Sequence, residues 1–231
     1  MVVDHQKDVE FNLKLKYLKI ENYKKIIKRW KNKMSRFRDP KLKRCRYLGI
    51  SPMSIGVDKD SNRKNAAGAH KKVSEYAIQL KEKQKLKFVY GVGEKQFRRY
   101  FTMASAKKGR TGELLLQILE SRLDNVVYRL GFAVTRPQAR QLVNHAHFEV
   151  NGKKVNIPSY LVSAGDVITV REGKKECGAI KQAIEATKTM ATPKWLQKDV
   201  EKLSGTVLKL SDREDIDIPI EEHLIVELYS K

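Results

Sequence analysis

Apolar residues recur first at helical and then at strand spacing between Glu120 and Arg171. The clearest element is a helix predicted to begin at Arg136, because Thr135 is a favoured N-cap residue and Gln138 follows it by three positions, as a capping box requires. Its apolar and polar residues occupy opposite faces, with Ala139, Leu142 and Val143 on one and Arg136, Arg140 and Asn144 on the other. The pattern predicts a helix that packs one face and leaves the other cationic.

A broad apolar stripe precedes this helix and predicts another one. The stripe consists of Leu114, Leu115, Ile118, Leu119, Leu123, Val126, Val127 and Leu130. Arg122 and Arg129 lie two turns apart along it, and Gly131 is the expected C-cap, because glycine takes up the left-handed conformation there at little cost. We therefore expect one helix that ends just before Gly131.

After His147 apolar residues recur at every second position, as in a strand. Asn151 and Gly152 separate two short runs, and Asn-Gly is a strong hairpin signal because both turn positions need a positive φ. A turn at Ala164–Asp166 precedes a further strand at Val167–Val170. The stretch thus predicts two short helices on a small antiparallel sheet with a basic edge. That edge is formed by Arg122, Arg136, Arg140, Lys153, Lys154 and Arg171.

The region before this stretch is predicted to be mainly helical. Lys72–Lys87 suggests a helix that Ser74 caps and whose basic face points outward. Its apolar positions are Val73, Ala77, Ile78, Leu80 and Leu86. Gly91–Gly93 should break it before a second helix. Ser51–Ala69 is predicted to be a loop, and Ala104–Gly112 a flexible basic linker.

The carboxy-terminal end is acidic, whereas the chain as a whole is basic. Glu172–Thr189 has helical spacing, whereas later apolar residues alternate as in strands. These are Leu208, Leu210, Ile216, Ile218, Ile220, Leu224, Val226 and Leu228. Asp212–Glu227 holds seven acids and a single base, Arg213. An acidic segment on a basic chain seldom faces a polyanion, so we expect this end to contact protein or to fold back on the amino-terminal part.

The composition indicates the class of binding partner. The formal net charge of +21 and the pI near 9.9 indicate a polyanionic partner, because phosphate contacts release counterions and attraction steers the encounter. A membrane surface is the rival polyanion, but no apolar run approaches the roughly 20 residues that span a bilayer. Cys45 and Cys177 belong to no Cys-x-x-Cys pair and are expected to be free thiols.

Residues 121–162, SRLDNVVYRLGFAVTRPQARQLVNHAHFEVNGKKVNIPSYLV, resemble the RNA-binding domain of the bacterial-type small ribosomal subunit protein four. Such domains also occur in pseudouridine synthases and tyrosyl-tRNA synthetases. The flanks Ser74–Tyr100 and Glu222–Lys231 are similar to the ribosomal protein and not to those enzymes, so the resemblance covers Met34–Lys231. It implies direct binding of small-subunit rRNA, nucleation of assembly of the body, contact with ribosomal protein five, and an influence on accuracy near the path by which mRNA enters.

The expected fold class is α+β. A helical amino-terminal domain precedes a small two-helix, antiparallel-sheet RNA-binding domain and a partly β carboxy-terminal segment. The expected boundaries are 1–33 for a basic extension outside the resemblance, 34–112 for the helical domain with its basic arm and loop, 113–175 for the RNA-binding domain, and 176–231 for the segment that packs on the rest. The resemblance leaves open whether the ribosome is that of a bacterial cytoplasm or of an organelle.

Candidate RNA contacts are basic residues in the motif, its linker and the arm. In Ser35–Tyr47 six bases face one acid, with Phe37 and Tyr47 able to stack on nucleotides, although a solvated charge run is the alternative. The candidates are Arg36, Arg38, Lys43, Arg44, Arg46, Lys83, Lys85, Arg98, Arg99, Lys107, Lys108, Arg110, Arg122, Arg136, Arg140, His145, Lys153 and Lys154. A second set matches loosely a family segment beside incoming mRNA: Arg63, Lys64, Lys71 and Lys72.

An RNA-modifying enzyme is the alternative function. Ser121–Asp124 is similar to a Gly-Arg-Leu-Asp motif that carries the catalytic aspartate of pseudouridine synthases, but here it lies inside the RNA-reading module. Asp124 is therefore expected to pair with a neighbouring arginine or to cap a turn, and no enzymatic activity is predicted. No metal or cofactor is predicted either, because Cys45 and His70 lack the neighbours that would complete a zinc site.

Overall fold

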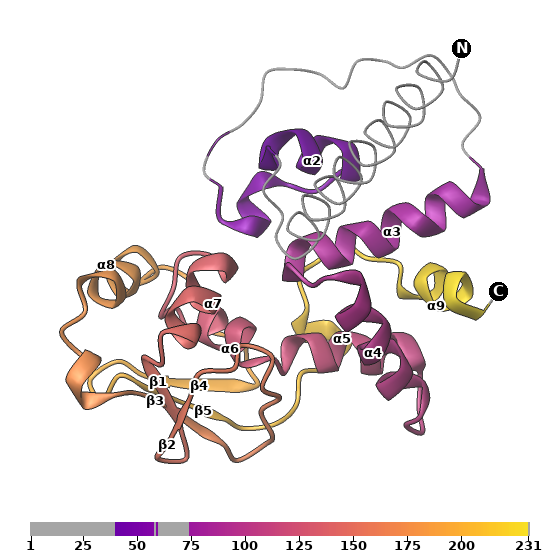
Figure 1. The fold of residues 1–231 in the computed structure, drawn as a ribbon. Coiled ribbons are helices and arrows are strands. Elements are labelled where there is room, and N and C mark those ends of the chain that lie inside the picture. Colours follow the sequence, from indigo (N-terminus) through magenta and orange to yellow (C-terminus); the bar gives the residue numbers. More distant parts are fainter. Residues whose placement is uncertain (1–39, 58, 60–73, 231) are drawn as a thin grey trace, which may run out of the picture. The chain divides into compact units, whose positions relative to one another are not determined.

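The computed structural model describes residues 40–57, 59 and 74–230, within a compact unit that comprises Pro40–Lys231 (Figure 1). The predicted mixed α+β class is confirmed, because these residues contain both helices and a five-stranded antiparallel sheet. The domain boundaries at 112 and 175 stay predictions. The extension 1–33 lies outside the described residues.

Helices come first along the chain. They are α2 (Lys41–Leu48), η1 (Pro52–Ile55), α3 (Glu75–Tyr90), α4 (Glu94–Ser105) and α5 (Thr111–Glu120). Ser74 caps α3 as predicted, since its hydroxyl accepts a hydrogen bond from the Ala77 N–H, and Gly91 ends the helix with a φ of 61°. The predicted loop from Ser51 was wrong over η1, where Pro52 begins a short 3₁₀ turn.

The long helix predicted before Gly131 was wrong, because the chain forms two helices there. These are α5 and α6 (Leu123–Arg129). Between them Arg122 is extended and forms a β-bridge with Leu161, while the Leu123 N–H donates to the Tyr160 carbonyl at 2.8 Å. A distant segment thus supplies the hydrogen bonds that a continuous helix would have supplied itself.

A sheet of order β2-β1-β3-β5-β4 follows α7 (Arg136–Asn144). Its strands are β1 (Phe148–Val150), β2 (Lys153–Val155), β3 (Val167–Val170), β4 (Leu196–Asp199) and β5 (Ser204–Val207). The Asn-Gly hairpin is confirmed, with φ values of 51° at Asn151 and 72° at Gly152. Figure 1 shows α6 and α7 over this sheet, and the core between them includes Phe132, Phe148 and Trp195.

The carboxy-terminal residues differ from the strand pattern that they suggested. After α8 (Gly178–Ala186) the strands β4 and β5 end at Val207, and Leu224, Val226 and Leu228 belong to the helix α9 (Glu222–Ser230). The other residues expected in strands also lie outside them: Leu208, Leu210, Ile216, Ile218 and Ile220. The strand prediction was wrong there because three alternate apolar residues fit either element when each is only partly buried. Helix α9 packs against α3 and α5, so this end folds back on the amino-terminal part as expected.

Close packing at Gly205 on β5 gives a stability prediction. A Cβ built on this residue would lie 2.5 Å from both terminal carbons of the fully buried Leu130. Because the core cannot yield freely, Gly205→Ala should lower the free energy of unfolding by about 1–3 kcal/mol, which urea denaturation measures. The control is Gly178→Ala, where a Cβ meets nothing within 4 Å and no loss is expected. Equal stability of the two variants would contradict the packing described here.

Candidate nucleic-acid interface

The basic side chains divide into a buried group and an exposed group. The buried group includes Arg122, Arg129 and Arg136, with exposed fractions of 3%, 7% and 9%. Each faces a carboxylate or carbonyl of the protein, because a buried charge is tolerated only when it is paired. The predicted cationic edge is therefore not continuous, and Arg122 and Arg136 were wrongly expected on it.

Asp124 connects two of the arginines. Its carboxylate accepts hydrogen bonds from Arg122 at 3.0 and 2.7 Å and from Arg140 at 3.0 and 2.8 Å. Arg122 also donates to the Tyr100 hydroxyl on α4. The expectation that Asp124 pairs with a neighbouring arginine is confirmed, and both of its oxygens are occupied within the protein.

Glu120, the last residue of α5, forms a second buried cluster. It accepts from Arg129 at 3.1 and 3.0 Å, from Asn125 at 2.6 Å, and from the Tyr90 hydroxyl. Burial acts to raise the pKa of this carboxyl, but the charges of Arg129 and Arg136 outweigh it, so the pKa lies below its ordinary value. Glu120 is therefore a buried anion that holds α5, α6 and the end of α3 together.

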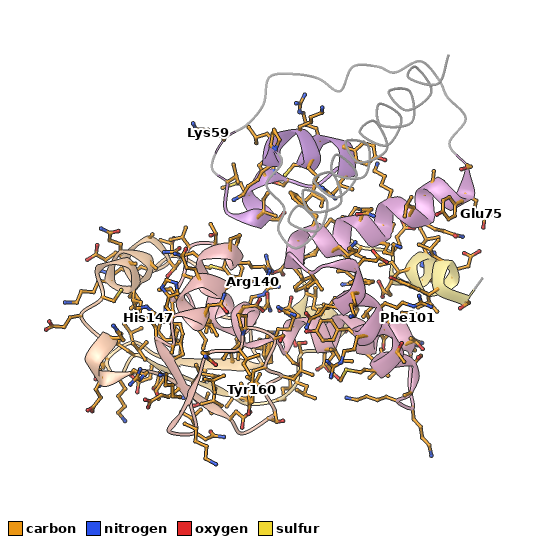
Figure 2. The ribbon with its side chains drawn as sticks, in the orientation of Figure 1. Lys59, Glu75, Phe101, Arg140, His147 and Tyr160 are labelled. Carbon is orange, nitrogen blue, oxygen red and sulfur yellow. The ribbon has the colours of Figure 1, made fainter. Side chains whose placement is uncertain are left out.

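Arg136 connects α7 to α6 and to η1. Its Nε donates to the Asn125 side-chain oxygen at 2.8 Å, and its Nη1 donates to the Ser54 carbonyl at 3.1 Å. The guanidinium lies over the Tyr128 and Tyr90 rings, 4.4 and 5.2 Å from their centroids. The face of α7 that the sequence predicted to be free for RNA is thus occupied at Arg136. Arg140, labelled in Figure 2, reaches the end of α3 and is only one-third exposed.

The prediction that the basic face of α3 points outward is also wrong, at two lysines. Lys83 donates to Glu94 at 3.1 Å, and Lys85 donates to Glu82 at 2.6 Å and to the Pro219 carbonyl at 3.3 Å. Each lysine side chain is only 13% exposed. Helix α9 and the chain before it cover this face, which sequence periodicity on α3 alone does not reveal.

The exposed group comes from separate elements. Its candidate members are Lys43 on α2, Arg98 and Arg99 on α4, Lys107, Lys108 and Arg110 on the following loop, His145 after α7, and Lys153 and Lys154 on the hairpin. Arg44 and Arg46 are half-buried, and Arg44 donates to Gln84 at 3.4 Å. We call the nine exposed residues the exposed basic set.

Several exposed bases were missed by the sequence analysis. Lys95 shares the exposed face of α4 with Arg98 and Arg99, so helical spacing alone would have found it. Lys174 lies near His147, which is labelled in Figure 2. The pKa of His147 falls below its ordinary value because of burial and the charges of Lys174, His145 and Arg171. Such positive surroundings favour an anion over a cation.

Six candidates lie outside the described residues, and the structure says nothing of them. They are Arg36, Arg38, Arg63, Lys64, Lys71 and Lys72. Among the residues that are described, no group of three His, Cys, Asp or Glu side chains is placed to hold a metal ion. None of the described helices has the length and apolar character that crossing a bilayer requires.

Two family models match the chain. One, the S4 domain, matches residues 121–168, and the other, the ribosomal protein S4/S9 N-terminal domain, matches residues 13–120. The second match begins before Met34, where the resemblance was expected to begin, and so includes part of the extension 1–33. The chain is 57% identical over 192 residues to small ribosomal subunit protein uS4 of Agathobacter rectalis, covering 83% of this chain and 97% of that protein. It is 56% identical over 194 residues to uS4 of Lachnospira eligens, covering 84% and 98%, and 61% identical over 170 residues to uS4 of Acetivibrio thermocellus, covering 72% and 82%.

The ion pairs of Glu94 give a prediction for pH dependence. Burial acts to raise the pKa of Glu94, but hydrogen bonds from Lys87 and Lys83 outweigh it and bring the pKa from 4.5 to about 2. A carboxyl whose pKa is lower in the folded than in the unfolded protein stabilises the fold at any pH above its unfolded pKa. This stabilisation is lost as the pH falls towards the folded pKa. Glu94→Gln should therefore lower the free energy of unfolding at pH 7 by at most about 1 kcal/mol, because the side chain is half-exposed.

The difference between wild type and Glu94→Gln should narrow as the pH falls from about 4.5 towards 2, in urea denaturation at each pH. Glu113→Gln is the control, since Glu113 pairs with the exposed Arg110 and should change stability little at any pH. A difference that stays constant over the whole range from about pH 4.5 to about pH 2 would contradict the assigned ion pairs.

Proposed function

This chain belongs to the family of the bacterial small ribosomal subunit protein uS4, and we propose that it is a structural constituent of the small ribosomal subunit that binds small-subunit rRNA directly. Its relatives are bacterial, which supports a bacterial ribosome in the cytoplasm as its location. The observation that carries the proposal is the distribution of the exposed basic set over both family-matched regions of the compact unit.

The exposed basic set provides phosphate contacts at two places. Residues of α4 and the following loop belong to the first matched region, and the hairpin lysines belong to the second. Two contacts joined in one chain raise the effective concentration of the second once the first has formed. Recognition by shape and phosphate is favoured, because the deep groove of A-form RNA is closed to side chains.

Three roles more specific than rRNA binding rest on the family resemblance. The protein nucleates assembly of the subunit body, contacts ribosomal protein five and influences decoding accuracy near incoming mRNA. The acidic carboxy-terminal residues that stay exposed, such as Asp217, suit a protein neighbour better than RNA. Arg63, Lys64, Lys71 and Lys72 remain the proposed mRNA contacts, and they lie outside the described residues.

An enzymatic role for Asp124 is disfavoured by its surroundings. The side chain is 5% exposed, and both oxygens accept hydrogen bonds from arginines. A nucleophile or base must reach the substrate atom within hydrogen-bond distance, and Asp124 would first have to leave these partners. The chain is accordingly proposed to act without catalysis, as the names of its relatives suggest.

The hairpin lysines test direct rRNA binding. Lys153→Ala with Lys154→Ala should weaken binding to naked small-subunit rRNA and reduce the slope of log affinity against log salt by about 0.7–0.9 for each phosphate that is no longer neutralised. Filter binding at several salt concentrations measures both quantities. Stability should not change, because both side chains are exposed.

The matched control removes two other exposed lysines. Lys202→Ala with Lys209→Ala changes the net charge equally, but these lysines pair with Asp199 and Asp212 in the carboxy-terminal region. This variant should retain the wild-type slope. Equal losses of affinity in both variants would show that only net charge matters, and a salt-independent wild type would refute direct phosphate binding.

A further inference from the structure

Two arginines of α7 reach backbone carbonyls in the amino-terminal helices. We call α2 to α5 with η1 the helical part, and α6 to α8 with the five strands the sheet part. Arg140 donates to the Gly91 carbonyl at 2.8 Å and to the Tyr90 carbonyl at 3.3 Å, and Arg136 donates to the Ser54 carbonyl at 3.1 Å. Tyr90 is the last residue of α3, where unsatisfied carbonyls and the negative end of the helix dipole attract a cation.

Asp124 fixes the orientation of Arg140. One carboxylate oxygen, Oδ2, accepts from Nε and Nη2 of Arg140, which leaves Nη1 directed at Gly91. The same carboxylate binds Arg122, which in turn donates to Tyr100 of the helical part. A single buried anion thus directs two arginines across the boundary between the parts.

The geometry of these hydrogen bonds suits a role in positioning the helical part relative to the sheet part. The guanidinium plane is rigid and its donors are fixed in direction, so bonds to one carboxylate and to two carbonyls determine an angle as well as a distance. A buried ion pair often adds little net stability, whereas its directional bonds can select one arrangement. The same bonds leave Arg140 few free donors for an RNA phosphate.

We propose that Asp124 and Arg140 form an orientation lock that holds the helical part and the sheet part at the spacing at which both engage rRNA. The proposal rests on the rRNA binding proposed above. Arg140 is on this account a positioning residue, and its effect on affinity comes from pre-organisation. The RNA contact assigned to Arg140 from the sequence is thereby replaced by an indirect role.

The salt dependence of binding separates the two roles. Arg140→Gln should lower the affinity for naked small-subunit rRNA by about ten- to a hundredfold, because both parts still engage the rRNA but must first adopt the spacing that the lock otherwise holds, and this cost removes part of the roughly 10²–10⁴ that linked contacts gain. The reduction should be the same at every salt concentration, with the wild-type slope, because no phosphate contact is removed. Arg140→Lys keeps the charge but not the fork, so it should recover little of the affinity.

A slope reduced by about 0.7–0.9 in Arg140→Gln and restored in Arg140→Lys would overturn the proposal and make Arg140 a phosphate contact. Wild-type affinity in Arg140→Gln would overturn it as well. Binding is measured per folded molecule, below the melting temperature of each variant, so that reduced stability does not count as reduced affinity. If Arg140→Gln does not fold, Tyr100→Phe removes one acceptor of the same network and should give a smaller reduction at unchanged slope; unchanged affinity would then refute the lock.

These outcomes are distinguishable from failure of the proposed function. If wild-type protein does not bind rRNA, or if Lys153→Ala with Lys154→Ala leaves affinity and slope unchanged, direct rRNA binding by the hairpin fails. If those results hold and only the Arg140 variants behave like wild type, the rRNA-binding function stands and the orientation lock alone is refuted.

Discussion

Two buried carboxylates, Glu120 and Asp124, stand at the break between α5 and α6, and the arrangement of the described chain depends on their neutralisation. Neither could be buried as an anion without partners, because desolvation of a lone charge costs far more than a folded domain can supply. Arg129 pairs with Glu120, while Arg122 and Arg140 pair with Asp124. Through Tyr90, Gly91 and Tyr100 these pairs join the end of α3 and the middle of α4 to α6 and α7. The arginines that neutralise the two carboxylates therefore also connect the helical part to the sheet part.

Local signals in the sequence predicted the elements that local interactions determine. The Thr135 cap and the Asn151–Gly152 turn need only their immediate neighbours, and both are confirmed. The break at Arg122 was not predictable in this way, because its hydrogen-bond partners lie in the segment near Tyr160. Nor was the burial of Arg136, whose partner carbonyl at Ser54 is 82 positions away. Periodicity separates polar from apolar positions, but it does not show which polar face another segment covers.

The high positive charge therefore has two uses in this protein. Arg122 and Arg129 neutralise Asp124 and Glu120, and Arg136 donates hydrogen bonds to Asn125 and to the Ser54 carbonyl. Lys83 and Lys85 lie under the returning carboxy-terminal segment, where Lys85 donates to the Pro219 carbonyl. The net charge of +21 indicated the class of partner, but only the structure separates these structural bases from the exposed basic set. The candidate interface was consequently predictable in its chemistry, and less so in its membership, because burial depends on tertiary contacts.

The central claim is that the exposed basic set faces rRNA in the small subunit while the carboxy-terminal lysines do not. Amine-reactive labelling of free protein and of purified small subunits, read by mass spectrometry, tests it most directly. The account predicts that Lys107, Lys108, Lys153 and Lys154 become less reactive in the subunit, whereas Lys202 and Lys209 keep a larger share of their reactivity. Undiminished labelling of the first four lysines in the subunit, or absence of the protein from purified subunits, would contradict it.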